Sequence, residues 1–324
     1  VLQEDALKHL QKSEEDNFDP TLESLAGALQ TTTNQVIEVM NQLLTMELVH
    51  RDMDRYCLTA SGREYALRII RAHRLWERYL ADRTGFGALE WHRKAERMEH
   101  RMTAAEVEAL ALKLGHPTHD PHGDPIPTVD GEHLSHSGQS LTTAPIDTPL
   151  RIVHIEDEPE VVYAKLLSKD LFPGMSIKII ESTPQLIRCW TERDECTLDP
   201  VVAANVSVEV VKKTDQVDLT RTRRLSQLEL GETARIVQLS PSIHGLERRR
   251  LMDLGFLKGA VIQAEVSSPG NDPVGYKIRG TLIALRKLQT QQIYIDDEPI
   301  SDKSLSNSTS STHNQNAPAT NPSQ

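Results

Sequence analysis

The spacing of apolar residues changes once along this 324-residue chain, and the change divides it into two structural classes. Up to residue 114 the apolar residues recur every three to four positions, as in amphipathic helices. After a loop rich in Pro, His, Gly and Asp at residues 115–147, the segments 149–211 and 228–296 contain short apolar runs typical of strands. The sequence therefore predicts a multidomain α+β protein, with a helical half followed by two small β-rich domains.

The two β-rich segments form an internal repeat, offset by 85 positions. The matching positions of the first segment are Leu166, Leu171, Gly174 and Ile177, and those of the second are Leu251, Phe256, Gly259 and Ile262. Each segment is expected to form a strand, a short helix, a tight glycine turn and three more strands. That order predicts two small β-barrels, each with an inserted helix.

The first 60 residues have the pattern of a winged helix-turn-helix. Two short helices are expected at 21–29 and 34–46, and residues 48–58 are expected to form two strands around an Asp-rich turn. The start of the second helix in such a module can contact base edges, and the wing can contact phosphates. The candidate DNA-binding residues are Thr32, Asn34, Gln35, Glu38, Arg51 and Arg55.

The charge of the chain restricts how it can bind nucleic acid. The net charge is −11, and residues 1–70 hold six Lys and Arg against twelve Asp and Glu. Broad non-specific binding requires neutralisation of phosphates and is therefore not expected. DNA contact would need a local basic surface or a divalent cation that offsets acidic charge. A winged helix used only for protein contact is the alternative.

Polar residues interrupt the apolar face of the next predicted helix. The helix is expected to begin at a capping box formed by Ser61 and Glu64. His73 and Glu77, at i and i+4, lie on its apolar face. A buried His–Glu pair costs several kcal/mol without partners, and a divalent metal is one such partner.

The following segment repeats this pattern. His92, Glu96, Glu99 and His100 fall on one helical face, and the N-terminal helix adds Asp5. Such residues can also be satisfied core side chains or solvated helix contacts, but taken together they favour a metal site. Imidazole and carboxylate ligands suit Mn(II) or Fe(II). The three cysteines form no CxxC pair, which fits a reducing cytosol and provides no thiolate cage.

At these residues the sequence resembles the diphtheria toxin repressor (DtxR/MntR) family of iron- and manganese-dependent bacterial regulators. The similar strings are LTASGREYA (58–66), RAHRLWERYL (71–80), WHRKAERMEHRM (91–102) and GHPTHDPHGDPIP (115–127). The resemblance covers residues 1–130. The first β-rich segment resembles the SH3-like C-terminal barrel of the longer family members. The second, with RRLMDLGFLKG and IRGTLIALRK, resembles the FeoA domain associated with ferrous-iron transport.

The resemblance divides the ligands between two sites. One site receives His73, Glu77 and His92, together with a carboxylate from the first barrel, for which we select Glu160 over the alternative Glu158. The other site receives Asp5, Glu96, Glu99 and His100.

The residue types at two of these positions bear on the metal. Asp5 and Glu96 are carboxylates, as in manganese-responsive members, where iron-responsive members typically have Met and Cys. Lys8 stands where manganese-only members often have a further carboxylate, which argues against a closely spaced two-metal cluster.

The resemblance implies a cytoplasmic, homodimeric, metal-dependent transcriptional repressor that binds a double-stranded DNA operator and controls metal homeostasis. No catalytic residue, membrane span or signal peptide is expected. A FeoA-type adaptor for metal transport and a non-haem iron enzyme are the alternatives. The expected domains are 1–62 (winged helix-turn-helix), 63–142 (helical metal-binding and dimerisation domain), 148–212 and 228–297 (barrels), and 300–324 (disordered tail).

Overall fold

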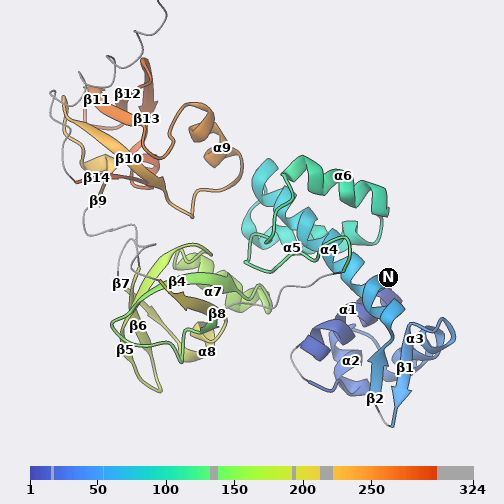
Figure 1. Ribbon diagram of the computed structural model, residues 1–324. Coiled ribbons are helices and arrows are strands. Elements are labelled where there is room, and N and C mark those ends of the chain that lie inside the picture. The colour runs from blue at the N-terminus through green and yellow to red at the C-terminus, as the bar shows by residue number, and fades with distance from the viewer. Residues whose placement is uncertain (16–17, 54, 132–137, 192–194, 212–221, 298–324) are drawn as a thin grey trace, which may run out of the picture. The chain divides into compact units, whose positions relative to one another are not determined.

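The computed structural model describes residues 1–15, 18–53, 55–131, 138–191, 195–211 and 222–297 (Figure 1). The chain divides into two compact units, one comprising residues 1–215 with 244–249 and the other comprising 216–243 with 250–324. The predicted disordered tail and most of the segment between the two β-rich segments lie outside the described residues.

The N-terminal module follows the predicted order of helix, turn, helix and hairpin. Its elements are α1 (Leu2–Glu15), α2 (Leu22–Ala28), α3 (Thr33–Thr45), β1 (Val49–Asp52) and β2 (Arg55–Leu58). Thr21 and Thr32 cap α2 and α3 through their hydroxyl oxygens, which accept backbone N–H groups. Leu7 of α1 and Leu43 of α3 are fully buried in the same core. Helix α1 is therefore part of this module.

Helix α4 (Ala60–Arg83) extends from the N-terminal module to α5 (Ala88–Glu99) and α6 (Ala104–Leu114), as Figure 1 shows. The predicted capping box at Ser61 is wrong, because the N-cap is Thr59, whose hydroxyl oxygen accepts the N–H of Gly62 at 3.0 Å. The start of the helix is packed so closely that a Cβ on Gly62 would lie 1.8 Å from the carbonyl oxygen of Leu48. The start of α4 thus depends on close packing against the residue just before β1.

The first β-rich segment, joined by a short strand from the predicted loop at 115–147, forms a six-stranded sheet in the order β3-β8-β4-β5-β6-β7. Its elements are β3 (Gln139–Ser140), β4 (Pro149–Ile155), α7 (Glu160–Ser168), β5 (Ser176–Ser182), β6 (Ile187–Thr191), β7 (Glu195–Leu198), α8 (Pro200–Ala203) and β8 (Val206–Val210). The strands of this sheet pair antiparallel around a core that includes Leu150, Ile152 and Ile179.

The second β-rich segment, joined by a short strand just before it, forms a six-stranded antiparallel sheet in the order β13-β12-β11-β10-β14-β9. Its elements are β9 (Thr222–Arg224), η2 (Leu225–Gln227), β10 (Thr233–Leu239), α9 (Gly245–Asp253), β11 (Val261–Ser267), β12 (Val274–Ile278), β13 (Thr281–Leu285), α10 (Lys287–Thr290) and β14 (Ile293–Asp296).

The two sheets confirm the internal repeat. In both, a helix follows the first long strand, and a glycine with positive φ, Gly174 or Gly259, precedes the next strand. The N–H of each glycine donates over 2.7 Å to a carbonyl in the preceding long strand, that of Ile152 or Ile236. Each repeat also contains a short helix before its last strand, α8 or α10, which the apolar pattern did not predict.

Candidate metal centre and DNA-facing surface

The predicted pair on α4 meets a histidine of α5 in a buried cluster, which we call the first cluster. Nε2 of His73 lies 3.1 Å from Oε1 of Glu77, and Nδ1 of His92 lies 3.4 Å from the same oxygen. One potential ligand atom from each residue falls within 4.8 Å of the others. Since α4 and α5 pack side by side, positions that are 15 residues apart in sequence, Glu77 and His92, face each other.

The first β-rich segment brings carboxylates to this cluster from the loop between β4 and α7. Oδ2 of Asp157 lies 2.8 Å from Nδ1 of His92, and Oε1 of Glu158 lies 3.5 Å from Nε2. Glu160, the residue that we selected from the sequence, is exposed at the first position of α7. Sequence reasoning missed Asp157, although it lies in the acidic run from Glu156 to Glu160.

The donor atoms of the first cluster fit a divalent metal. Oε1 of Glu77 and Nδ1 of His92 are buried and make no hydrogen bond, despite their short separations from other polar atoms. Burial lowers the pKa of His92, but the carboxylates of Asp157, Glu158 and Glu77 outweigh this effect and raise its pKa well above the usual range. Burial also opposes ionisation of Glu77, yet His73 and His122 hold its pKa well below its usual range. The site concentrates anionic carboxylates in a buried volume, which a cation would compensate.

A second cluster joins α1 to the end of α5. Nε2 of His100 lies 3.2 Å from Oδ1 of Asp5 and 3.4 Å from Oε1 of Glu99. Burial raises the pKa of Asp5. On the other side of the ring, Oε2 of Glu4 lies 2.7 Å from Nδ1 of His100, and Oε1 of Glu4 accepts a hydrogen bond from Tyr65 at 2.7 Å. Glu4 therefore orients the imidazole, a role that sequence reasoning missed.

Glu99 connects the two clusters. Its side chain is fully buried, and its two oxygens accept hydrogen bonds from Nζ of Lys8 over 2.7 and 2.9 Å. Oε2 of Glu99 also lies 2.5 Å from Nδ1 of His73. A continuous path of polar contacts therefore runs from α1 through α5 to α4.

Glu96 lies nearer to the first cluster than to the second. Its side chain is 52% exposed, and Oε1 lies 3.6 Å from Nε2 of His92, one helical turn earlier. The triad of Asp5, Glu99 and His100, in which Glu99 is buried and the other two are partly buried, forms without it. The resemblance had assigned Glu96 to that second cluster.

A third buried group includes Glu77 together with Asp120 and His122 from the loop after α6. Nδ1 of His122 lies 3.6 Å from Oε2 of Glu77, and neither ring nitrogen of His122 has a hydrogen-bond partner. Burial raises the pKa of Asp120 to about 6. Oδ1 of Asp120 accepts the backbone N–H groups of His122, Gly123 and Asp124 over 2.8–2.9 Å and thereby shapes the loop.

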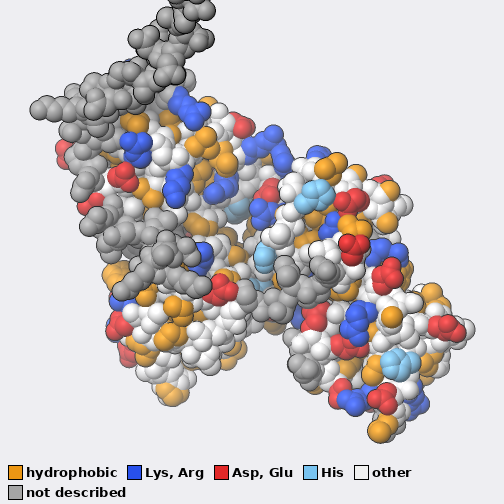
Figure 2. All heavy atoms as spheres, in the orientation of Figure 1, with side chains coloured by type: hydrophobic (Ala, Val, Ile, Leu, Met, Phe, Trp, Pro, Cys, Tyr) orange, Lys and Arg blue, Asp and Glu red, His pale blue; other side chains and the backbone are white. Residues whose placement is uncertain are grey.

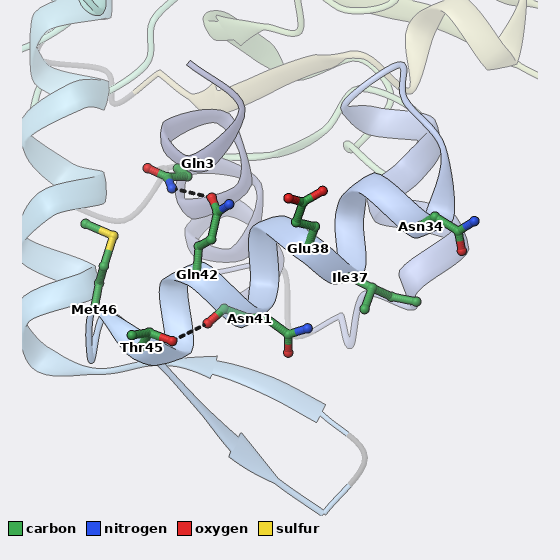
Figure 3. Close-up of a pocket in the computed structure, with 8 residues that line it drawn as sticks. All are labelled: Gln3, Asn34, Ile37, Glu38, Asn41, Gln42, Thr45 and Met46. Carbon is green, nitrogen blue, oxygen red and sulfur yellow. Dashed lines mark hydrogen bonds between the residues drawn. The ribbon is translucent and has the colours of Figure 1, made fainter.

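The predicted base-contacting helix α3 presents a polar face with a shallow pocket (Figure 3). The pocket residues are Gln3, Asn34, Ile37, Glu38, Asn41, Gln42, Thr45 and Met46. All but Gln3 and Met46 belong to α3, and they lie opposite its buried positions, such as Val36 and Leu43. Figure 3 also shows the hydrogen bond between Gln3 of α1 and Gln42, which spans 2.7 Å.

Two candidate base contacts have a local structural role in this surface. Thr32 and Gln35 form the capping box of α3, in which each side chain accepts the backbone N–H of the other residue. The Gln35 side chain is also hydrogen-bonded to the hydroxyl of Thr31. Asn34 and Glu38 remain on the face that lines the pocket.

The two wing arginines are exposed but make contacts within the module. Arg51 donates from Nε to the carbonyl of Met53 over 3.0 Å, and Arg55 pairs with Asp19 at 2.9 Å. Helix α3 itself contains no Lys or Arg. Figure 2 shows acidic and basic side chains interspersed over the visible face of this module.

Comparisons with known proteins agree with this geometry. The family model described as iron dependent repressor, metal binding and dimerisation domain matches residues 59–128, and the FeoA domain model matches residues 223–297. The chain is 27% identical over 221 residues to the iron-dependent repressor IdeR of Mycobacterium leprae. This match covers 63% of this chain and 95% of that protein. The chain is 28% identical over 186 residues to the diphtheria toxin repressor of Corynebacterium diphtheriae, which covers 54% of this chain and 82% of that protein.

A solved structure shows the same similarity. A manganese-dependent transcriptional repressor in complex with manganese matches with a TM-score of 0.60 and 25% identity. The match covers 65% of this chain and all of that chain. Among the described residues, no helix is both long and apolar enough to cross a membrane.

Proposed function

Because the chain belongs to the diphtheria toxin repressor family of metal-dependent transcriptional repressors, with a FeoA domain added at 223–297, we propose that it represses genes of metal homeostasis in response to Mn(II) or Fe(II). It acts in the cytoplasm as a homodimer on a double-stranded operator. Its relatives are repressors, so the chain is a regulator and not an enzyme.

We propose two metal positions. His73, Glu77, His92 and Asp157 would hold one ion, with Asp157 taking the role that the resemblance assigned to Glu160. Asp5, Glu99 and His100 would hold the other, and Glu96 would complete it by a change of side-chain rotamer. A bound divalent ion would supply positive charge that offsets these carboxylates and a bond between α1 and α5.

The observation that carries the function is that Asp5 lies on α1, a helix whose buried residues belong to the core of the DNA-binding module, while its cluster partners lie at the end of α5. Helix α1 packs on α3 through buried Leu7 and through the hydrogen bond from Gln3 to Gln42. Fixing Asp5 against Glu99 and His100 would therefore fix the orientation of α3. Coupling requires that metal binds the DNA-competent state better than the other state.

The exposed face of α3 indicates which bases it would contact. Asn34 and Asn41 can each make paired hydrogen bonds with adenine, and Ile37, which is 39% exposed, can pack on a thymine methyl group. We propose that each half-site contains A·T pairs at these positions. Two α3 helices of a dimer would contact half-sites about one DNA turn apart. Arg51 and Arg55 would hold phosphates.

The test is DNA binding by fluorescence anisotropy, with duplexes selected from a randomised library by the full-length protein in the presence of Mn(II). Affinities are compared anaerobically with Mn(II), Fe(II), Zn(II) and EDTA. We expect Mn(II) or Fe(II) to tighten binding at least tenfold. Equal affinity with metal and with EDTA would contradict the proposal.

Two variants separate base recognition from phosphate contact. Asn41→Ala is expected to lose about 1–3 kcal/mol on the selected duplex and to relax its sequence preference. Arg51→Ala is expected to weaken binding to all duplexes and to reduce the salt dependence by about one unit. Gln35→Ala is a poor test, since it would also remove the half of the capping box in which the Gln35 side chain accepts the backbone N–H of Thr32.

The FeoA match favours one second candidate function, a protein-binding adaptor for metal transport. The two functions make different predictions for the same variants. An adaptor with an unused winged helix would keep its metal response in cells when Asn41 and Arg51 are changed to Ala. A repressor would lose regulation of its target genes.

A further inference from the structure

Lys8 occupies the metal-binding face of α1. It follows Asp5 by three positions, so both side chains project toward α5. Its ammonium contacts both oxygens of Glu99, at 2.7 and 2.9 Å. The Lys8 side chain is 24% exposed, whereas that of Glu99 is fully buried. The ammonium is thus a cation that neutralises a buried carboxylate of the second cluster.

The second cluster needs Glu99 as well. Oε1 of Glu99 is the atom that lies 3.4 Å from Nε2 of His100, and the same atom is the nearer partner of Lys8. Oε2 of Glu99 is shared between Lys8 and His73. A divalent ion held by Asp5, Glu99 and His100 would lie within a few ångströms of the ammonium, where two positive charges repel in a partly buried site.

We propose that Lys8 is a built-in competitor of the metal, a residue that sets the affinity of the second cluster. The ammonium holds Glu99 in the metal-free protein and moves away from it when an ion binds. The side chain can do this because it reaches solvent, whereas Glu99 cannot follow it. This inference rests on the proposed metal-dependent function and specifies what sets the metal concentration at which the protein responds.

The first test measures Mn(II) binding to the full-length, metal-free protein by the electron paramagnetic resonance signal of free Mn(II). Lys8→Gln keeps the length of the side chain without its charge, and we expect it to raise the affinity of one ion at least tenfold at unchanged stoichiometry. Lys8→Arg keeps the charge and is expected to bind no more tightly than wild type.

Two background variants assign the effect to a cluster. In an Asp5→Asn background, the tighter binding of Lys8→Gln should disappear because the second cluster is damaged. In a His92→Ala background, it should persist because only the first cluster is affected. Unchanged or weaker Mn(II) affinity in Lys8→Gln would overturn the inference.

A measurement on the wild-type protein avoids any effect of substitution on folding. Lysine acylation followed by peptide mass spectrometry reports whether an amine is free to react. We expect Mn(II) to raise acylation of Lys8 several-fold, while Lys12, paired with Glu156 at 2.7 Å, stays unchanged as an internal control. Equal acylation of Lys8 with and without bound Mn(II) would contradict displacement of the ammonium.

The outcomes distinguish this inference from the function on which it rests. If wild type binds Mn(II) but its DNA affinity does not respond, the proposed function fails. If Mn(II) controls DNA binding but Lys8→Gln does not tighten Mn(II) binding, only the role of Lys8 fails.

Discussion

The carboxylate of Asp157 lies 2.8 Å from Nδ1 of His92, so the loop after β4 meets helix α5 at the first cluster. The contact joins the first β-rich segment to the helical region through His92, which also contacts Glu77. A carboxylate from the first β-rich segment is thereby part of the donor set of the first cluster. Which acidic residue supplies this carboxylate can be tested by substitution.

Asp157→Ala is expected to weaken metal binding at the first cluster by about 10- to 100-fold, the range seen when groups that hold or orient metal ligands are removed. Glu160→Ala is the matched control, because Glu160 is exposed at the start of α7, and it should bind as wild type does. Isothermal titration with Mn(II) measures both. A larger loss in Glu160→Ala than in Asp157→Ala would return the role to Glu160.

Metal binding at the first cluster is expected to release protons, and its affinity should rise with pH. Burial lowers the pKa of His92 and of His73, but nearby carboxylates outweigh it and raise both above the usual range. The raised pKa values favour protonated rings in the metal-free protein, whereas a metal needs a neutral imidazole nitrogen. Up to about two protons should leave per ion.

Titration calorimetry in buffers of different ionisation enthalpy measures this release. His92→Ala should release about one proton fewer than wild type for each ion that still binds. Heats that do not depend on the buffer would show that the histidines are already neutral.

Glu4→Gln is expected to weaken metal binding at the second cluster by about tenfold, because Glu4 orients the His100 ring through a 2.7 Å contact. Tyr65→Phe removes only the hydroxyl that donates to Glu4, so its effect should be smaller. The Mn(II) affinities of the two variants and of wild type, measured by the electron paramagnetic resonance signal of the free ion, show which substitution has the larger effect. Equal affinities in wild type and Glu4→Gln would assign Glu4 a purely structural role.

Gly62→Ala is expected to destabilise the protein by about 2 kcal/mol or more, because the added Cβ would lie 1.8 Å from the backbone oxygen of Leu48. Gly27→Ala, in helix α2, meets nothing within 4 Å and should stabilise by about 0.5–1 kcal/mol. Urea unfolding of the metal-free proteins measures both differences. Similar midpoints for the two variants would show that the start of α4 tolerates a shift away from Leu48.

The sequence by itself determined which residues share a face. His73 with Glu77 on one helix, and Glu99 with His100 at the end of the next, enter the same clusters because helical periodicity is a local property of the backbone. The internal repeat of the β-rich segments was also visible in the sequence, because its glycine turns and buried positions recur at a fixed spacing.

Only the tertiary structure decided which faces of the helices and loops contact each other. It also decided which of several chemically equivalent side chains lies at each cluster. Glu158 and Glu160 both fitted a barrel ligand, and the path of the loop instead placed Asp157 at 2.8 Å from His92. Lys8 could have pointed to solvent, and the packing of α1 on α5 put it on Glu99. Such distances between residues far apart in sequence depend on how elements pack, which local spacing does not encode.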